Sequence, residues 1–317
     1  MTLTLRLLET SAEMAAVEQL QRLVWPGSET DIVPGHMLQA AVHGGGLVIG
    51  AFTGESRPFE AALEMESSPA PSPVGPLVGF VFGFPGTYPT PDGPRLKHYS
   101  HMLGVHPEFR NQGIGFRLKR AQWQMARRQG VDRVTWTYDP LLSVNARLNI
   151  AQLGAVCNTY HADFYGEMRD GLNAGLPSDR FEVDWWINTR RVEMHLSRES
   201  RQVLDVEHYR AAHTTVLNPA LLAPGGWVQP GEAPLPNPDY PTPLLMVEIP
   251  PDFQALRRAN SGLAQEWRLH TRTIFQVLFE QGYLVTDFVH SPGELPRSYY
   301  VLAHGEAEIG GVKRSDF

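Results

Sequence analysis

The segment at residues 105–115 combines residue types that can hold a phosphate group. It reads Val-His-Pro-Glu-Phe-Arg-Asn-Gln-Gly-Ile-Gly, and it joins a strand-like stretch, ended by Pro107, to a helix-like stretch that opens near Ile114. Gly113 and Gly115 lack a Cβ atom, so backbone N–H groups can approach a ligand closely there. The first N–H groups of a helix have no internal partner, and the helix dipole adds positive potential, so such a terminus binds phosphate. We therefore predict an anion-binding turn.

The glycine turn does not match the two best-known phosphate motifs. No Lys-Ser/Thr pair follows its second glycine, as the P-loop requires, and the G-x-G-x-x-G spacing of the dinucleotide fingerprint is missing. A strand-to-helix turn without a ligand is the alternative, because so short a pattern also arises by chance.

His101 lies on the strand that leads into the turn, four residues before Val105. Strict alternation along a strand puts Tyr99, His101, Leu103 and Val105 on one face, and His98 on the other. An imidazole at this position can accept a proton as a general base. A purely structural histidine beside the sheet is the alternative.

Two further places carry groups that can bind a charged substrate. Asp31 lies in segment 25–34, between two predicted helices, and can bind an ammonium group, although helix capping is the more common role. Arg190 and Arg191 follow the aromatic stretch 181–187 and can bind a carboxylate through parallel hydrogen bonds. Plain surface exposure is the alternative for both arginines.

Periodicity predicts a chain of mixed strands and helices. In the first part we expect strands at 3–8, 47–52, 77–84, 96–105, 133–138 and 156–165, and helices at 11–25, 34–43, 114–129 and 143–153. Residues 54–76, rich in Pro, Ser and Glu, are expected to form a loop. In the second part we expect strands at 181–187, 244–249, 283–289 and 298–303, a long helix at 252–282, and irregular chain at 216–243. The order predicts an α/β fold with a mixed central sheet flanked by helices and an additional C-terminal α/β region.

Composition limits the kinds of partner. The 317 residues suffice for two domains, and the net charge of −7 argues against general nucleic-acid binding. A basic group on one predicted helix is expected to be a solvated face; its members are Arg117, Lys119, Arg120, Arg127 and Arg128.

No apolar run is long enough for a membrane span, and the start of the chain lacks the pattern of a signal peptide. The single cysteine, Cys157, excludes an intrachain disulfide and fits a reducing compartment, so we expect a cytoplasmic protein. The twelve histidines show no zinc-like spacing, so no metal is expected.

The stretch 105–115 resembles the acyl-CoA signature of the GNAT superfamily of acyltransferases, and the element order over 3–105 fits that fold. The resemblance implies a GNAT-type sheet in which backbone amides of residues 111–116 surround the CoA pyrophosphate, while 103–105 follow the pantetheine arm. The CoA-binding residues that it implies are Leu103, Gly104, Val105, Arg110, Asn111, Gln112, Gly113, Ile114, Gly115, Phe116 and Asn145. In this fold, segment 25–34 borders the acceptor cleft.

Later stretches resemble a GNAT subgroup of predicted acetyltransferases with a long C-terminal extension. Those stretches are Thr137-Tyr138-Asp139-Pro140-Leu141, Asn145-Ala146, Leu153-Gly154-Ala155, Tyr165-Gly166 and Val247-Glu248-Ile249-Pro250. The resemblance implies a GNAT acyl-CoA-binding domain at 1–169 and an extension at 170–317 that completes or covers the acceptor cleft. Some members of this group N-acylate amino acids, including with succinyl-CoA.

The resemblance also implies a mechanism: an amine attacks the thioester of acetyl-CoA or another acyl-CoA directly. His101 is then the expected base, and a backbone amide near Val105 the donor to the oxyanion. The family's general acid is a tyrosine four residues before the glycine of the Leu-Gly pair, a place that Ile150 occupies here and that cannot donate a proton. Tyr138, Tyr160 and Tyr165 are other donors to consider. By the same count Ser143 replaces the family's CoA-contacting asparagine, with Asn145 or Asn149 in a shifted role.

Three functions stay open from the sequence. The first is an N-acyltransferase that acts on a small-molecule amine, including an amino acid, and the second is a non-catalytic acyl-CoA-binding regulatory protein on the same scaffold. Acylation of a protein is the third. The expected protein partner is a second copy of the chain in a homodimer, with no nucleic acid and no membrane.

Overall fold

The computed structural model describes residues 3–27, 29–54, 75–166, 168, 175–197, 204–223 and 225–305. The chain divides into two compact units between Trp136 and Thr137. The described part of unit 1 is 3–136, and that of unit 2 is 137–168 with 175–305 and the gaps given above. This division differs from the boundary expected at residue 169, because residues 137–168 pack with the C-terminal part of the chain.

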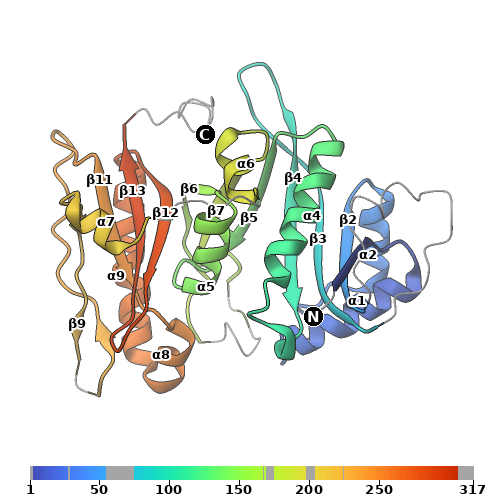
Figure 1. Cartoon of the computed structure of the whole chain (residues 1–317), viewed down its shortest axis with the longest axis horizontal. Helices are drawn as coiled ribbons and strands as arrows, with labels where there is room; N and C mark the ends of the chain where they lie inside the picture. The colour runs from blue at the N-terminus through green and yellow to red at the C-terminus, as the bar shows by residue number, and fades with distance from the viewer. Residues whose placement is uncertain are drawn as a thin grey trace. The chain divides into compact units, whose positions relative to one another are not determined.

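Unit 1 carries the first strands and helices of the chain (Figure 1). They are β1 (Leu3–Leu7), α1 (Ser11–Val24), α2 (Gly35–His43), β2 (Leu47–Thr53), β3 (Leu77–Tyr88), β4 (Arg95–Val105), the 3₁₀ turn η1 (Pro107–Phe109), α4 (Ile114–Arg128) and β5 (Arg133–Tyr138), whose last two residues belong to unit 2. The loop expected at 54–76 lies almost entirely outside the described residues.

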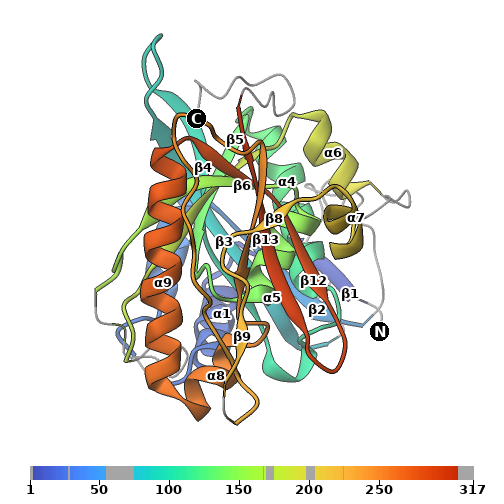
Figure 2. The same ribbon diagram turned by 90° about the vertical axis from the view of Figure 1, so that its left-hand side faces the viewer.

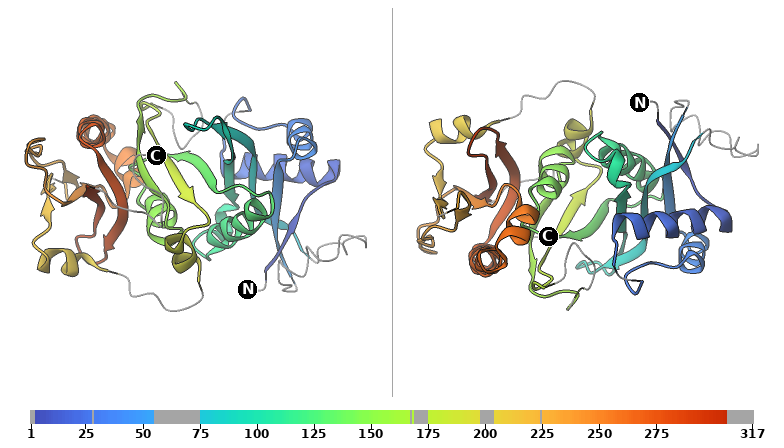
Figure 3. Two further views of the ribbon diagram at one scale, coloured as in Figure 1. Left: turned by 90° about the horizontal axis from the view of Figure 1, so that it is seen from above. Right: turned by 90° about the horizontal axis from the view of Figure 1, so that it is seen from below.

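The sheet of unit 1 is mixed, with the strand order β1-β2-β3-β4-β5. Strands β1 to β4 pair antiparallel in sequence order, and β5 pairs parallel to β4. Helix α4 packs on one face of this sheet, through Ile114 and Leu118, and α1 packs on the other through Met14 and Val17 (Figure 3). The predicted mixed sheet flanked by helices is thereby confirmed for this unit.

Local signals account for the helix ends. Thr10 caps α1 through a reciprocal pair of bonds, because its hydroxyl accepts from Glu13 N and the Glu13 carboxylate accepts from Thr10 N. The cap lies one residue before the expected Ser11. Helix α4 has Gly113 as its N-cap and ends before Gly130, whose φ of 73° is the left-handed conformation expected of a helix-ending glycine.

Unit 2 contains the remaining elements (Figure 1). They are α5 (Ser143–Ala146), the π-helical turn η2 (Arg147–Gln152), β6 (Val156–His161), β7 (Arg180–Trp186), α6 (Arg190–Leu196), α7 (Val206–Ala211), β8 (Thr215–Val216), β9 (Leu221–Leu222), β10 (Val228–Gln229), β11 (Leu244–Ile249), α8 (Phe253–Ala259), α9 (Ser261–Glu280), β12 (Tyr283–Ser291) and β13 (Arg297–His304). The strand order in its main sheet is β7-β6-β12-β13-β11-β8. Helix α9 is the long helix that runs beside these strands (Figure 2).

Two ion pairs hold α9 against the part of unit 2 that precedes residue 180. Arg268 donates to both carboxylate oxygens of Asp139, at 2.8 and 2.5 Å, and both side chains are buried. One turn later, Arg272 donates to both oxygens of Asp179, at 2.8 and 2.7 Å. Bidentate ion pairs of this kind fix the orientation of both side chains. They therefore hold α9 in one position relative to residues 139 and 179.

The helices of unit 2 depart from the sequence-based expectation at three points. The long helix expected at 252–282 is two helices, because the side chain of Asn260 accepts from Leu263 N and starts α9 afresh. The helix expected at 143–153 is α-helical only as far as Ala146 and continues as a π-helical turn. Helices α6 and α7 were not predicted, because both are short.

Candidate active site

The glycine turn has the geometry of an anion-binding site. Asn111 and Gly113 have φ values of 60° and 74°, which turn successive N–H groups toward the same side. A Cβ atom built on Gly113 would meet nothing within 4 Å, so the space in front of the turn is open. Phe109 packs into the core below α4 and anchors the start of the turn.

The first N–H groups of α4 have no intrahelical acceptor. Gly113 provides no capping side chain, and Arg117 N donates to Gly113 O at 3.1 Å as the first bond of the helix. The N–H groups of residues 114–116 precede this bond and therefore have no acceptor within the helix. The Ile114 side chain is buried in the core, so only its backbone can serve a ligand, whereas Asn111, Gln112 and Gly113 are exposed.

Arg110 links the turn to two neighbours. Its guanidinium donates to Val105 O and to Val24 O, each at 3.4 Å. These long bonds tie the turn to the end of β4 and to the C-terminus of α1. The side chain is exposed, so it can add positive charge beside the backbone groups.

Strands β4 and β5 pair over only a short length. Their register pairs are His98 with Val134 and Tyr99 with Thr135. His106 N donates to Val78 O at 2.9 Å. Because the direction of the N–H groups alternates along an antiparallel strand, the N–H of Gly104 also points toward β3, while those of Leu103 and Val105 point toward the opposite edge of β4. The edge of β4 at Leu103 and Val105 thus lies beyond the point where pairing with β5 ends.

A β-bulge at His101 changes the face on which its side chain lies. Phe82 pairs with Met102 while Gly83 pairs with Ser100, so His101 is the extra residue of β4. Leu103 and Val105 pack on the α4 face, whereas Met102 packs with Phe82 on the α1 face. The prediction that His101 shares a face with Leu103 and Val105 is wrong, because strict alternation does not hold across a bulge.

His101 lies among aromatic rings. Its ring centroid is 5.8 Å from that of Phe82, 5.9 Å from that of Phe84 and 6.2 Å from that of Tyr99. The imidazole is exposed on its outer side, but this crowded surrounding removes enough water to lower its pKa. The neutral form, which can accept a proton, is therefore favoured.

A buried polar network lies on the opposite face of β4. Lys119 Nζ donates to Ser100 Oγ and to Gln122 Oε1, each at 2.9 Å, and lies 3.5 Å from the centroid of the Trp136 ring. Because Gln122 accepts through its oxygen, its amide nitrogen donates to His98 Nε2 at 3.2 Å. Burial and the Lys119 charge lower the pKa of His98 to about 4, and burial lowers that of Lys119.

This network was missed from the sequence. Lys119 is 1% exposed, so its assignment to a solvated helix face is wrong. The available signal was its place beside the apolar stripe of Ile114, Leu118 and Ala121, which the helical repeat brings next to the sheet.

Asp31 lies in the connection between α1 and α2. Two residues at the ends of this connection, Trp25 and Val33, pack into the same core as Phe82, Phe84 and Met102. The Asp31 Oδ2 atom is buried, and within the described residues it has no hydrogen-bond partner. The expected capping role therefore does not engage this oxygen, which can accept a donor from a ligand.

The other predicted site residues belong to unit 2. Asn145 lies partly exposed on α5, while Ile150 is fully buried in η2. Ser143 Oγ donates to Pro250 O at 3.0 Å, so this hydroxyl serves the packing of unit 2. Asn149 is 5% exposed.

Arg190 and Arg191 are the first two residues of helix α6, and their side chains do not act together as one carboxylate-binding pair. Arg191 Nε donates to Gly154 O at 2.8 Å, and its Nη2 donates to Thr286 O. These bonds give Arg191 a structural role. Arg190 is exposed.

The three tyrosines considered as proton donors differ in environment. Tyr138 and Tyr300 share a buried hydrogen bond of 3.0 Å, and Tyr160 donates to Asp179 Oδ2 at 2.5 Å. Burial raises the pKa of Tyr138 and, together with the Asp179 charge, that of Tyr160. Tyr165 is 46% exposed, and its hydroxyl lies 2.9 Å from Thr137 Oγ1. Tyr165 is thus the most accessible of the three.

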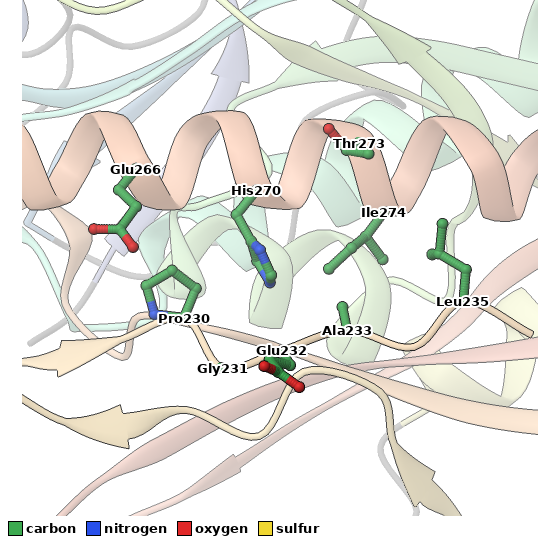
Figure 4. A pocket seen from close by; sticks show the side chains of 9 residues that line it. All are labelled: Pro230, Gly231, Glu232, Ala233, Leu235, Glu266, His270, Thr273 and Ile274. Atoms are coloured by element: carbon green, nitrogen blue, oxygen red, sulfur yellow. The ribbon is translucent and has the colours of Figure 1, made fainter.

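A cavity of about 470 Å³ lies in unit 2, between α9 and segment 230–235 (Figure 4). Its lining contains none of the predicted site residues and consists of Pro230, Gly231, Glu232, Ala233, Leu235, Glu266, His270, Thr273 and Ile274. Among the described residues, no three His, Cys, Asp or Glu side chains are grouped so that they can hold a metal ion. In the same part of the chain, no helix is both long and apolar enough to cross a membrane.

The sequence of residues 56–147 matches the model of the acetyltransferase (GNAT) family. The matched segment includes β3, β4, the glycine turn, α4 and β5. The chain therefore carries an acetyltransferase domain of the GNAT family, a family of acyl-CoA-dependent N-acetyltransferases. The chain continues for a long stretch beyond the matched segment.

Several solved structures are similar to part of the chain. Arabidopsis thaliana NAA60 in complex with a bisubstrate analogue is 19% identical, with a TM-score of 0.43, covering 59% of this chain and 100% of its own. For the IAA acetyltransferase from Bacillus cereus the identity is 14%, the TM-score 0.37 and the coverage 58% and 98%. For Ard1 from Thermoplasma volcanium these values are 14%, 0.39, 58% and 97%. No curated protein sequence matches the chain.

Proposed function

We propose that the protein transfers an acyl group from acetyl-CoA or succinyl-CoA to the amine of a small acceptor, with amino acids among the candidates. The observation that carries the proposal is that β4–β5 pairing ends at Tyr99, before the last residues of β4 that lead into the glycine turn. The edge of β4 at Leu103 and Val105 can then bind the pantetheine arm, while the N–H groups of the turn bind the pyrophosphate.

The reaction needs a base for the attacking amine. The neutral amine attacks the thioester carbon, a C–N bond forms, and the nitrogen becomes acidic; His101 takes its proton. The N–H of Val105 donates to the oxyanion of the tetrahedral intermediate. The C–S bond then breaks, its electron pair stays on sulfur, and the CoA thiolate takes up a proton from water.

The acceptor is proposed to carry a carboxylate that an arginine binds. Arg190 is the better candidate of the pair, because Arg191 already donates to two carbonyl groups.

Thiol release measures the proposed function. The protein is mixed with acetyl-CoA or succinyl-CoA and with free amino acids of both chiralities, their amides and their esters. We expect thiol release above the hydrolytic background with one donor and at least one amine. If amides and esters react as well as free amino acids, the carboxylate is not bound.

Arginine variants locate the carboxylate contact. Arg190→Ala is expected to raise KM for free amino acids about tenfold or more, since a charged hydrogen bond contributes about 1.5–3 kcal/mol. Arg258→Ala, an exposed arginine of α8, is the matched control and should leave KM unchanged. An unchanged KM in Arg190→Ala removes this arginine from the acceptor site.

A non-catalytic acyl-CoA-binding role is the second candidate. It is favoured by the buried Ile150 at the place of the family's proton-donating tyrosine. In that case calorimetry would show acyl-CoA binding, while no amine in the panel would release thiol.

A further inference from the structure

The surface around His101 is aromatic. Phe84 and Tyr99 lie beside it with ring centroids 5.5 Å apart, and Phe82 lies below at 5.7 Å from Phe84. Phe82 is 3% exposed, Phe84 and Tyr99 are partly exposed, and His101 is exposed. We call Phe84, Tyr99 and His101 the aromatic surface.

The bulge is what assembles this surface. Without the extra residue in β4, the His101 side chain would lie on the α4 face with Leu103. With the bulge, the imidazole lies beside Phe84 and Tyr99, on the face that α1 and its connection to α2 cover. Base and aromatic rings therefore share one position on the sheet.

An acidic group, Asp31, lies in the connection between α1 and α2, whose residues Trp25 and Val33 pack on the same face. Trp25 and Val33 flank Asp31 in the chain and pack with Phe82 and Phe84 in one core. Asp31 Oδ2 is buried and, among the described residues, accepts no hydrogen bond. A cationic hydrogen-bond donor on a ligand would stabilise a buried oxygen in this state.

We propose that the acceptor is a primary amine that carries an aromatic ring, a class that includes aromatic amino acids. Its ring packs against Phe84 and Tyr99, because offset and edge-to-face contacts between aromatic rings stabilise a complex beyond the effect of the buried area. Its ammonium group is drawn to Asp31 and to the faces of the rings before deprotonation. The proposal rests on the proposed function and adds the substrate class.

Binding can be measured without turnover. The CoA-loaded protein is titrated by calorimetry with 2-phenylethylamine, with 2-cyclohexylethylamine, which keeps the ammonium and the ring size but has no π system, and with 2-phenylethanol, which lacks the ammonium. We expect the Kd of 2-phenylethylamine to be at least about tenfold lower than that of either analogue. Equal affinity for the cyclohexyl compound overturns the aromatic contact, and equal affinity for the alcohol overturns the role of Asp31.

Variants locate the contacts. Phe84→Leu and Tyr99→Leu are expected to reduce the preference for the phenyl over the cyclohexyl compound to less than about threefold, and Asp31→Asn to weaken both amines but not the alcohol. Tyr240→Leu is the control, because Tyr240 is 82% exposed and lies in unit 2. An unchanged preference in folded Phe84→Leu and Tyr99→Leu variants contradicts the proposal.

Turnover separates this inference from the proposed function. If 2-phenylethylamine binds selectively but no amine releases thiol from acetyl-CoA or succinyl-CoA, the catalytic function is wrong and the binding class stands. If aliphatic amines react as fast as aromatic ones, the catalytic function stands and the aromatic class is wrong.

Discussion

The side chains of His101 and Leu103 lie on opposite faces of β4, although a single residue separates them. Leu103 packs with the α4 core, while the His101 ring contacts Phe82 and Phe84. The β-bulge at His101 is the cause, because it adds one residue to β4 between the pairs made by Ser100 and Met102. The proposed base and the proposed pantetheine contact can thus face different parts of a substrate complex.

His101→Gln should keep acyl-CoA affinity and lower kcat. Glutamine retains a polar side chain of similar size but cannot take the amine proton at neutral pH, and a general base contributes about 10²–10⁴-fold. Single-turnover kinetics with saturating acyl-CoA measures the effect. A variant with wild-type kcat would show that the histidine only packs against its aromatic neighbours.

The acid limb of the rate profile should lie below pH 6.5. The surroundings of His101 lower its pKa from the ordinary 6.5, so the base loses activity only as pH falls through a lower value. The measurement is kcat/KM against pH, corrected for the fraction of neutral amine. A limb at or above 6.5, or one that persists in His101→Gln, argues for a different base.

Gly113→Val should abolish CoA binding, and Gly130→Val should not. Both glycines have positive φ, 74° and 73°, and open space at the Cβ position, at opposite ends of α4. The two variants therefore carry a similar backbone strain of about 1–2 kcal/mol. Only at Gly113 does the new side chain stand in front of the N–H groups of the turn. Equal CoA affinity in the two folded variants would contradict the pyrophosphate site.

Arg268→Met or Asp139→Asn should each lower the free energy of unfolding by about 3–5 kcal/mol, because each leaves a buried charge without its partner. The pair is joined by two hydrogen bonds, and both side chains are buried. Urea unfolding of the single and double variants gives the coupling energy. Arg210→Met, which breaks an exposed pair with Glu207, is the control and should cost about 1 kcal/mol or less. Additive losses at Arg268 and Asp139 would argue against direct coupling.

Stability should fall as pH drops from 6.5 toward 4. The folded protein holds the pKa of His98 at about 4, so the unfolded chain binds the extra proton first in this window. The contribution of His98 is complete above pH 6.5, and about 3 kcal/mol of it is lost by pH 4. Urea unfolding at several pH values measures the slope, which His98→Gln should flatten and His36→Gln, at an exposed histidine, should retain. An unchanged slope in His98→Gln would assign the acid sensitivity to other groups.

The sequence alone determined the glycine turn and the elements on either side of it. Strand β4, the turn and α4 were expected at 96–105, 105–115 and 114–129, and the structure has the two elements at Arg95–Val105 and Ile114–Arg128. The determining signals are local: Pro107 ends the strand, Gly113 and Gly130 take positive φ at the helix ends, and the 3.6-residue repeat fills the helix between them. Residues close in the chain carry this information, so a sequence pattern can show it.

Only the tertiary structure decided how the site is arranged. The bulge at His101 is a property of two paired strands, where Gly83 admits His98 so closely that a Cβ atom would lie 2.2 Å from Nε2. The burial of Lys119 depends in the same way on Ser100 and Gln122, and the position of α9 depends on ion pairs to residues 139 and 179. These features join residues far apart in the chain. Their free energy comes from packing and desolvation that exist only once the strands and helices have met, so a local pattern can place Lys119 beside the apolar stripe of α4 but does not show its partners.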